Sequence, residues 1–509
     1  LHVWWARRPL VASRAAVAAS LLDARANRDS FVHMLGIHGD PVATRKRIDR
    51  ARKTGEDLGL NPYGYERAFK YLPTPEERLW FQEAMRDAGV ADAKVLDPTA
   101  GGGSIPFESL RLGIATLGND LNPVATLVQK ATYEFPLTHG SQLVDEFIRL
   151  SGRFVQLAEP RFEGIFPRED ERTQVLGYLW ARAIRCPHCD GWVPLSPNWR
   201  LAADGTGVRL IPRTGSGPGD RSRRVDFELV TKAKEQSPGT VAGGDATCPF
   251  NDCHRLISSD HIKSEARAGR MGEQLYAVAL KQRTEAQSKS GRRRHTWERR
   301  YRAPKPEDHP SDIIEARLAQ MLPEWDALDL LPSERVPADI NDDRPIQYGM
   351  PLWRDMFSPR QLFGHCTAVE TFRLLMDTER SQGRWSDLTA AAFVYLSLAL
   401  DKLLNYNARS CRWDTTTGRV RAVFDRHDFA FVWSYAEMAP AISGGGFDWA
   451  FDQTAKCIGE LVGLVRPTDR AGDFPQAGFN FNPAEPPLPI PQITLTCKSG
   501  DSLDHIADS

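Results

Sequence analysis

Two aspartates and three consecutive glycines in the stretch 94–123 have the types and the spacing of a ligand-binding turn. The stretch reads KVLDPTAGGGSIPFESLRLGIATLGNDLNP and predicts a strand ending at Asp97, a glycine turn, a helix over about 105–112 and a strand over 114–117. Asp120 follows the second strand. Glycines let a backbone turn tightly and approach a ligand that a Cβ would push away. A carboxylate at such a strand end can accept hydrogen bonds from the hydroxyls of a ribose.

The order of these glycines excludes two common phosphate-binding motifs. Gly101, Gly102 and Gly103 are consecutive, unlike the G-x-G-x-x-G of dinucleotide sites, and no Lys-Ser or Lys-Thr pair follows them as in a Walker loop. One interpretation is an ordinary strand–turn–helix corner of an α/β enzyme. The other rests on the full pattern D-P-T-A-G-G-G-S followed by D-L-N-P, which resembles the S-adenosylmethionine (SAM) site of amino-group DNA methyltransferases.

The resemblance implies SAM as the cofactor and assigns its contacts to the turn and the two strand ends. These residues are Asp97, Pro98, Thr99, Ala100, Gly101, Gly102, Gly103, Ser104, Asp120, Leu121 and Asn122. It adds Asp501, because the third strand of such cores ends in Gly-Asp-Ala or Gly-Asp-Ser and its carboxylate reaches the adenine amino group. That strand is expected at 493–497, after the proline-rich linker 483–491.

Eight cysteines include two pairs with metal-ligand spacing. Cys186 and Cys189 are separated by two residues, and Cys248 and Cys253 by four. In a large chain without a secretion signal, such pairs favour a metal over disulfides. Four thiolates give Zn²⁺ a closed tetrahedral shell, which suits a structural metal. The segments between the pairs predict short antiparallel strands, so the sequence indicates a zinc ribbon over 186–253.

The second cysteine pair is longer than the usual two-residue spacing, so a degenerate or metal-free ribbon is the alternative. His188 and His254 are the alternative ligands. The remaining cysteines show no metal spacing and are expected to be packed thiols, at positions 366, 411, 457 and 497.

The strongest run of basic residues lies at 281–302 and is interleaved with Trp297 and Tyr301. A solvated loop and helix face is the ordinary interpretation. The functional interpretation is a strip that follows a phosphate backbone while aromatic rings stack on bases. The candidate contacts to nucleic acid are Arg292, Arg293, Arg294, Trp297, Arg299 and Arg300.

Composition limits the class of protein. The chain has 509 residues, of which 41% are hydrophobic and 26% charged, and a formal net charge of −1. These values indicate two to four globular domains and confine any nucleic-acid surface to a local patch. The longest apolar runs are far shorter than the ~20 residues of a membrane span, and the sequence shows no signal peptide. A cytoplasmic protein without a membrane partner is therefore expected.

Several blocks extend the resemblance over most of the chain. WWARRPL lies near residue 4, DPTAGGGSIPFESLRLG forms the turn region, and MFSPRQL at 356–362 and WSYAEMAP at 433–440 follow. Together they resemble the bacterial and archaeal family of adenine-specific DNA methylases that contain a zinc ribbon, whose N-terminal domain is catalogued as a domain of unknown function. The WWARRP block either packs into the core or forms a wall of the cofactor or substrate site.

The resemblance implies an α/β fold, an incomplete Rossmann-like SAM-dependent methyltransferase core interrupted by a large insertion of helices and a zinc ribbon. A helical region at 1–93 is expected to pack on the core, whose first half lies at 94–140. An insertion at 141–345 contains the ribbon and the basic run, and a mainly helical domain for target recognition follows at 346–482. The linker and the third core strand occupy 483–509.

Periodicity and capping residues predict further local elements. A helix is expected from Pro9 to about residue 24, two amphipathic helices within 141–184, and helices near 313–322 and 388–404. Ser358, followed by proline, is expected to cap a helix. The segment SGGGF at 443–447 is a candidate for a mobile loop.

The catalytic tetrapeptide of this family, Asp/Asn-Pro-Pro-Tyr, does not occur in the chain. Residues 61–65 (NPYGY) lack the second proline and precede the cofactor strand, so we interpret them as a look-alike. We therefore expect a fragment that carries the cofactor half, contains no catalytic residues and is inactive alone.

The implied reaction is methyl transfer from SAM to adenine N6 in double-stranded DNA, with the target base flipped out and cytosine N4 as the near alternative. Other subunits of a defence system are expected as further partners. Two other functions stay open: an RNA base methyltransferase, and a non-catalytic nucleic-acid-binding component of a phage-defence or restriction–modification system. SAM binding separates the enzyme from the non-catalytic component.

Overall fold

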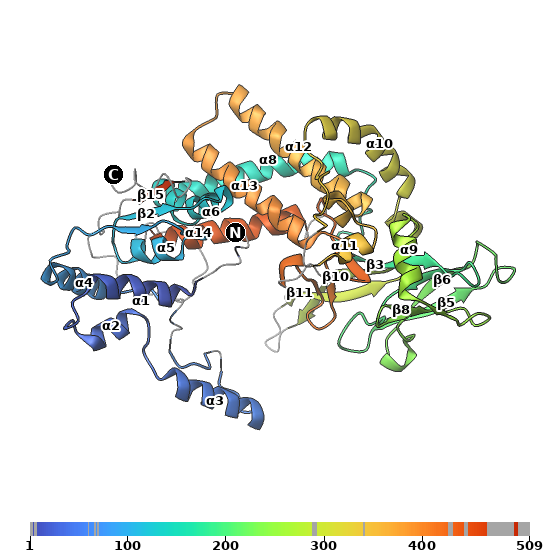
Figure 1. Cartoon of the computed structure of the whole chain (residues 1–509), viewed down its shortest axis with the longest axis horizontal. Helices are drawn as coiled ribbons and strands as arrows, with labels where there is room; N and C mark the ends of the chain where they lie inside the picture. The colour runs from blue at the N-terminus through green and yellow to red at the C-terminus, as the bar shows by residue number, and fades with distance from the viewer. Residues whose placement is uncertain are drawn as a thin grey trace. The chain divides into compact units, whose positions relative to one another are not determined.

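The structure is a computed structural model, shown in Figure 1. It describes residues 4, 8–59, 61–65, 68, 71–287, 293–338, 342–425, 431–441, 446–465 and 493–496. The chain divides into two compact units, one comprising Leu1–Ile148, Ser386–Tyr395 and Thr454–Ser509, and the other Arg149–Trp385 and Leu396–Gln453. None of the described helices combines the length and the apolarity needed to cross a membrane.

The first unit opens with four helices, α1 (Leu10–Leu21), α2 (Arg28–Met34), α3 (Pro41–Thr54) and α4 (Pro75–Asp87). Pro9 precedes α1, which confirms the helix predicted from that proline. A capping box starts α4: the Thr74 hydroxyl accepts from the Glu77 amide, and the Glu77 carboxylate accepts from the Thr74 amide. This reciprocal pair also fixes the position of the Glu77 side chain.

A three-stranded parallel sheet follows, in the order β1 (Val95–Asp97), β2 (Thr116–Asn119), β15 (Ile493–Thr496). The strand predicted near the C-terminal end is therefore confirmed, and it pairs with β2 from Ile493 opposite Thr116. The connecting helices are α5 (Ser104–Arg111) and α6 (Pro123–Gln129), and α6 continues through a π-helical turn at Lys130–Glu134 into α7 (Phe135–His139).

A buried ion pair joins α1 to α5. Arg14 Nε lies 2.7 Å from Glu108 Oε2, and neither side chain is exposed to solvent. Arg111 also pairs with Glu108, and the guanidinium groups of Arg14 and Arg111 both donate to the carbonyl of Tyr71. Because a buried charge is stable only when it is paired and hydrogen-bonded, this cluster fixes α5 against the N-terminal helices.

The second unit contains a sheet in the order β11 (Arg293–Arg302), β10 (Gly272–Gln287), β3 (Thr173–Arg185), β14 (Ser434–Glu437), with β4 (Trp192–Leu195) also paired to β3. The second of the two helices predicted within 141–184 is therefore wrong. α8 (Gln142–Ala158) is helical as predicted, but β3 is a strand buried on both faces from Tyr178 to Ile184. Burial on both faces removes the polar–apolar alternation by which a strand is recognised.

Short strands lie between and beside the cysteine pairs, as predicted for a ribbon. β5 (Gly207–Arg213) and β6 (Arg224–Val230) form an antiparallel hairpin. β7 (Val241–Ala242), β8 (Asp245–Thr247) and β9 (Leu256–Ile257) form a small antiparallel sheet, and α9 (Ser259–Arg267) follows. Buried side chains such as Trp199, Phe250 and Ile257 pack with the cysteines in one hydrophobic core.

Helices occupy most of the remaining chain. They are α10 (Ser311–Ala327), α11 (Arg344–Gln347), α12 (Pro359–Ser381), α13 (Asp387–Tyr406) and α14 (Phe447–Val465). α10 and α13 confirm the helices predicted near 313–322 and 388–404. Ser358 caps α12 as predicted, because its hydroxyl accepts from the Gln361 amide. A two-stranded pair is formed by β12 (Trp413–Asp414) and β13 (Arg419–Val420), and positions 443–445 of the predicted loop lie outside the described residues.

Candidate functional site

The glycine turn connects the carboxyl end of β1 to the first residue of α5. Gly101 and Gly103 have φ angles of 55° and 79°, in the left-handed region that favours glycine. A Cβ on Gly103 would lie 2.7 Å from the Tyr133 hydroxyl, so the position also has no room for a side chain. The predicted turn is therefore present, and its backbone conformation requires glycine.

Asp120 binds the turn directly. One carboxylate oxygen accepts from the Gly101 amide at 2.7 Å, and the other accepts from the Asn122 amide at 2.9 Å. The strand-end carboxylate predicted from sequence thus lies beside the glycines. Each of its oxygens keeps a second lone pair for a ligand donor.

Asp97 is the second carboxylate at this edge of the sheet, and its residue is only 6% exposed. Burial raises its pKa above the ordinary value, and the charge of Asp120 acts in the same direction. A hydrogen bond from the Thr99 amide and the positive charge of Arg8 act in the opposite direction. The site therefore contains two neighbouring carboxylates, which favours a ligand that carries positive charge.

Three residues that the sequence analysis did not select hold the turn in place. Asn119 donates to the Pro98 carbonyl at 3.1 Å, and its own carbonyl accepts from the Ala100 amide. Gln129 donates to the Gly101 carbonyl at 3.0 Å, and the Tyr133 hydroxyl donates to Gln129 at 2.7 Å. The spacing of four residues between Gln129 and Tyr133 is the only local pattern that could have indicated them.

Trp4 packs against the other side of the turn. A Cβ on Gly101 would lie 2.9 Å from Trp4 Nε1, and one on Gly102 would lie 3.2 Å from Trp4 Cδ1. Of the two interpretations of the WWARRP block, the contacts of Trp4 favour a wall of the glycine-turn site. Trp5 and Arg7 lie outside the described residues.

The remaining predicted cofactor residues have different surroundings. Ser104 is the first residue of α5, Leu121 is 72% exposed, and the Asn122 side chain caps α6 by accepting from the Val124 amide. Asp501 lies outside the described residues. The look-alike at 61–65 is engaged in its own turn, since the Asn61 side chain accepts from the Tyr63 amide and donates to the Tyr65 carbonyl.

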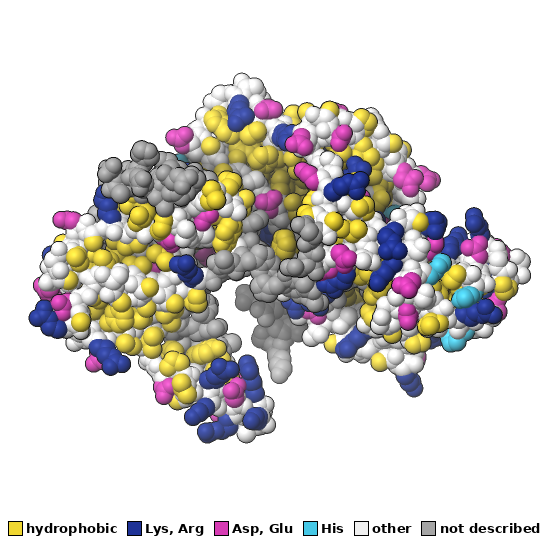
Figure 2. All heavy atoms as spheres, viewed as in Figure 1, with side chains coloured by type: hydrophobic (Ala, Val, Ile, Leu, Met, Phe, Trp, Pro, Cys, Tyr) yellow, Lys and Arg dark blue, Asp and Glu magenta, His cyan; other side chains and the backbone are white. Residues whose placement is uncertain are grey.

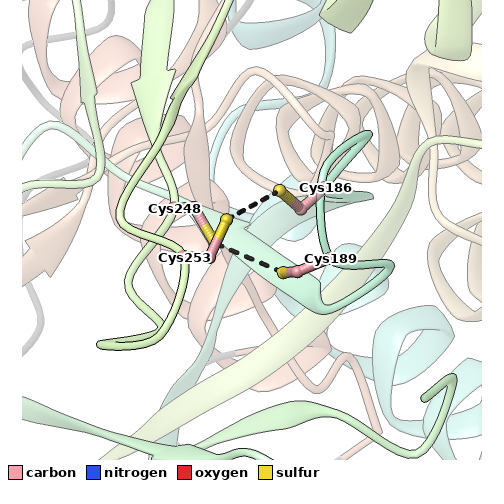
Figure 3. A group of neighbouring side chains, drawn as sticks. All are labelled: Cys186, Cys189, Cys248 and Cys253. Atoms are coloured by element: carbon pink, nitrogen blue, oxygen red, sulfur yellow. Dashed lines mark hydrogen bonds between the residues drawn. The ribbon is translucent and has the colours of Figure 1, made fainter. Parts of the chain in front are cut away.

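The four predicted metal-ligand cysteines lie together in the second unit (Figure 3). The Sγ atoms of Cys186 and Cys253 are 3.8 Å apart, and those of Cys189 and Cys248 are 3.7 Å apart. Four sulfurs placed 2.3 Å from a central ion in a tetrahedron are separated by about 3.8 Å, whereas a disulfide requires about 2 Å. The cluster could therefore bind a metal ion.

The longer second knuckle has a structural explanation. Phe250 packs so closely on Gly191 that a Cβ there would lie 2.4 Å from the ring. Asp252 pairs with the buried guanidinium of Arg223, with N–O distances of 2.5 and 2.9 Å. The extra residues thus anchor the knuckle. His188, one alternative ligand, instead donates from Nε2 to the Leu256 carbonyl.

Neighbouring thiols in the cluster shift one another's pKa values. A hydrogen bond from Cys248 lowers the pKa of Cys186 to about 5, and the backbone amides of His188 and Cys189 act in the same direction. The same interaction raises the pKa of Cys248. The close approach of the thiols thus shifts the pKa values of Cys186 and Cys248 in opposite directions.

The basic run at 281–302 lies on the antiparallel strands β10 and β11, so the expected helix is wrong, whereas the described side chains at 296–300 are exposed, as the interpretation as a solvated surface requires. Cross-strand pairing was not visible in the charge pattern, because polar side chains occupy both faces of the hairpin. Arg299 pairs in register with Lys281, and Trp297 with Arg283. Because side chains alternate along a strand, these four residues share one face.

Ion pairing and ring contacts distinguish the two faces of this hairpin, since described side chains on both faces are exposed. Trp297 is 48% exposed, and Lys281 Nζ lies 4.8 Å from the centroid of its ring. Arg300, on the opposite face, pairs with Glu298 at 2.9 Å. Arg292 lies outside the described residues, and Arg293 and Arg294 are described only as the first backbone positions of β11.

A second cationic surface lies on α3, within the helical region expected at 1–93. Six of its 14 residues are lysine or arginine. Figure 2 shows these side chains gathered on the helix. Lys46, Arg50 and Lys53 follow one face at helical spacing, opposite the buried Ala51. These three cations form no ion pair within the described part of the chain.

The comparisons with known proteins match only the N-terminal segment. The family model described as "Protein of unknown function (DUF1156)" matches residues 1–47. This match shows a domain of unknown function over these residues and shows no family for the rest of the chain. Comparison with curated proteins finds no match, and comparison with solved structures finds none either.

Proposed function

We propose that this chain is part of a SAM-dependent amino-group DNA methyltransferase whose target is adenine N6. The observation that carries the proposal is the glycine turn at the carboxyl edge of a parallel sheet, with Asp97 at the end of one strand and Asp120 after the next. Ligands of open α/β sheets bind outside the carboxyl ends of the strands. The strand order β1-β2-β15 supports the proposal, because one half of a nucleotide-binding sheet is expected to have this order.

The turn residues fit SAM chemically. SAM carries a sulfonium and an ammonium group, and both complement the two carboxylates. Asp120 would accept from the ribose hydroxyls while its bonds to the Gly101 and Asn122 amides hold its orientation. Leu121 offers an exposed apolar side chain for the adenine ring. SAM supplies the electrophilic methyl group when bound, and this chain's residues bind and orient it.

Catalytic residues are not assigned. An exocyclic amine conjugated with an aromatic ring is a poor nucleophile, and the tetrapeptide that would hold its hydrogens does not occur in this sequence. The proposed chain therefore supplies cofactor binding and DNA contacts.

The proposed partner is DNA, for which the two cationic surfaces provide complementary charge. The α3 face would contact phosphates, and the β10–β11 face combines cations with the exposed Trp297, which can stack on a base. The same surfaces suit a non-catalytic nucleic-acid-binding component, so SAM binding is the discriminating property.

We propose Zn²⁺ as the ion of the four-cysteine cluster. Its sulfur separations match a tetrahedral thiolate shell, and a closed shell without an open position suits a structural metal. The ion would join the two knuckles and complete the core of the ribbon.

Calorimetric titration with SAM tests the proposal. Wild type is expected to bind, and Asp120→Asn, which keeps one acceptor oxygen but removes the charge, is expected to bind at least about tenfold more weakly, as for the loss of a charged hydrogen bond. Asp92→Asn alters an exposed aspartate of the same unit and serves as the matched control. Failure of wild type to bind SAM, or equal affinities for all three proteins, would contradict the proposal.

A further inference from the structure

Two histidines and a glutamate in the first unit form a cluster separate from the glycine turn and the cysteines. His33 lies in the last turn of α2, His38 lies five residues later, and Glu77 lies in the first turn of α4. One potential ligand atom from each lies within 4.8 Å of the others. We propose that these three side chains bind a divalent transition-metal ion.

The chain reversal after α2 places the two imidazoles together. Gly36, with φ of 79°, follows the helix and donates to the His33 carbonyl at 2.8 Å, and a Cβ there would lie 2.6 Å from Tyr71 Cβ. The rings of His33 and His38 stack with their centroids 4.0 Å apart. Glycine at this position thus allows the reversal and the stacking.

The hydrogen bond of His38 to a backbone carbonyl identifies which of its ring nitrogens is the donor. Its Nε2 lies 3.1 Å from the His33 carbonyl. A carbonyl oxygen can only accept, so Nε2 carries the proton and the neutral ring keeps its lone pair on Nδ1. Donation from one ring nitrogen to a backbone carbonyl is the arrangement that orients a metal-binding histidine.

Glu77 is oriented in the same way. Its Oε2 accepts from the Tyr71 hydroxyl at 2.5 Å and from the Thr74 amide at 2.8 Å. Its Oε1 faces His33 Nδ1 in direct contact. The hydrogen-bonded contact of these two atoms places two potential ligand atoms side by side, where a metal ion could bind both.

The ligand set indicates the class of ion. Two imidazoles and one carboxylate suit zinc, iron, cobalt or nickel, whereas magnesium and calcium prefer oxygen ligands. The His33 side chain is 59% exposed, so water can complete the coordination, whereas Glu77 is 13% exposed and held by neighbours. The arrangement is an open site, in contrast to the closed four-cysteine cluster.

Cobalt titration of metal-free, reduced full chain tests this site by a spectroscopic readout. Co²⁺ bound to the cysteines produces a thiolate charge-transfer band, and Co²⁺ at the histidine site does not. We expect wild type to bind one ion with this band and a second without it. His38→Ala should lose only the second ion, and Cys248→Ser should lose only the charge-transfer phase.

Matched variants separate coordination from folding. Glu77→Gln keeps the capping box, because glutamine also serves at that position, but it should abolish the second phase. Tyr71→Phe should weaken the second phase by about 10- to 100-fold, the usual effect of losing a partner of a metal ligand. His139→Ala should change neither phase. Absence of the second ion in wild type, or its retention in both His38→Ala and Glu77→Gln, would overturn the proposal.

Discussion

Arg360 and Glu437 form a bidentate ion pair in the interior of the second unit. Arg360 Nε lies 3.1 Å from Glu437 Oε1, Nη2 lies 2.7 Å from Oε2, and both side chains are at most 2% exposed. Arg360 belongs to the MFSPRQL block and Glu437 to the WSYAEMAP block. Two blocks that sequence analysis could only list separately are thus joined by one buried contact.

Aromatic and polar neighbours surround this pair. The guanidinium of Arg360 lies 4.3 Å from the ring centroid of Tyr178 and 4.6 Å from that of Phe166. Trp180 Nε1 donates to Glu437 Oε2 at 2.7 Å. Because the charges are paired and hydrogen-bonded, removal of one partner leaves an uncompensated buried charge.

Glu437→Gln is therefore expected to lower the free energy of unfolding by about 3–5 kcal/mol. Urea unfolding followed by tryptophan fluorescence measures the effect. Glu298→Gln removes a charge of the same kind from the exposed pair with Arg300 and should cost less than about 1 kcal/mol. Similar losses for the two variants would show that the buried pair has no special structural role.

Asp97→Asn is expected to stabilise the protein at neutral pH. Since the pKa of Asp97 is raised in the folded state, the folded state binds its proton more tightly than the unfolded chain does. The ionised carboxylate therefore reduces stability above the folded pKa, and this cost disappears as the pH falls below the unfolded value of 3.8. Asparagine can still accept from the Thr99 amide.

Melting temperatures from neutral to acidic pH test this expectation. Asp97→Asn should melt higher than wild type at neutral pH, and the difference should vanish at acidic pH. Asp92→Asn, which removes the same charge from an exposed turn, is the control. A lower melting temperature for Asp97→Asn at neutral pH would mean that its charge stabilises the fold.

The four-cysteine cluster is expected to contain one Zn²⁺ per chain in freshly purified, reduced protein. Metal analysis should find this ion in wild type and in Cys457→Ser, which changes a cysteine outside the cluster, but not in Cys248→Ser. Chelation should unfold the ribbon, because binding free energy contributes to folding, and should leave SAM affinity unchanged. Absence of zinc from wild type would refute the assignment.

Removal of the outward cations of α3 is expected to weaken binding of duplex DNA. Lys46→Gln combined with Arg50→Gln removes two candidate phosphate contacts, so the slope of log affinity against log salt should decrease by about 1.8. Arg45→Gln with Arg52→Gln removes equal charge from the flank that contains Asp49 and serves as control. Fluorescence anisotropy measures both pairs, and equal effects would indicate a general charge effect without a defined face.

On the β10–β11 hairpin, DNA binding can be compared after removal of a single arginine from either face. Arg299→Gln should weaken binding of single-stranded DNA, whereas Arg300→Gln, the adjacent residue on the opposite face, should have little effect because Arg300 already pairs with Glu298. Trp297→Phe should also weaken binding, since its exposed ring is the proposed stacking surface. Equal losses from Arg299 and Arg300 would contradict the assignment of a face.

The sequence by itself determined the local features of both candidate sites. The turn at Gly101–Gly103 and the knuckles around the cysteine pairs depend on residues a few positions apart, and their conformations follow from glycine stereochemistry and ligand spacing. For the same reason, the Ser358 cap and the helices α1, α5, α8, α10 and α13 were predicted correctly. Asp120 was also identified, because the strand–turn–helix–strand unit that places it beside the turn lies within thirty residues.

Tertiary structure decided the features that depend on burial and cross-strand register. β3 is a strand because neighbouring strands and helices bury both of its faces, and the basic run is divided between two faces because β10 pairs with β11 in one register. The cluster of His33, His38 and Glu77 likewise exists only because α2 and α4 pack together. Such contacts join residues far apart in the chain, and no local pattern of residue types specifies them.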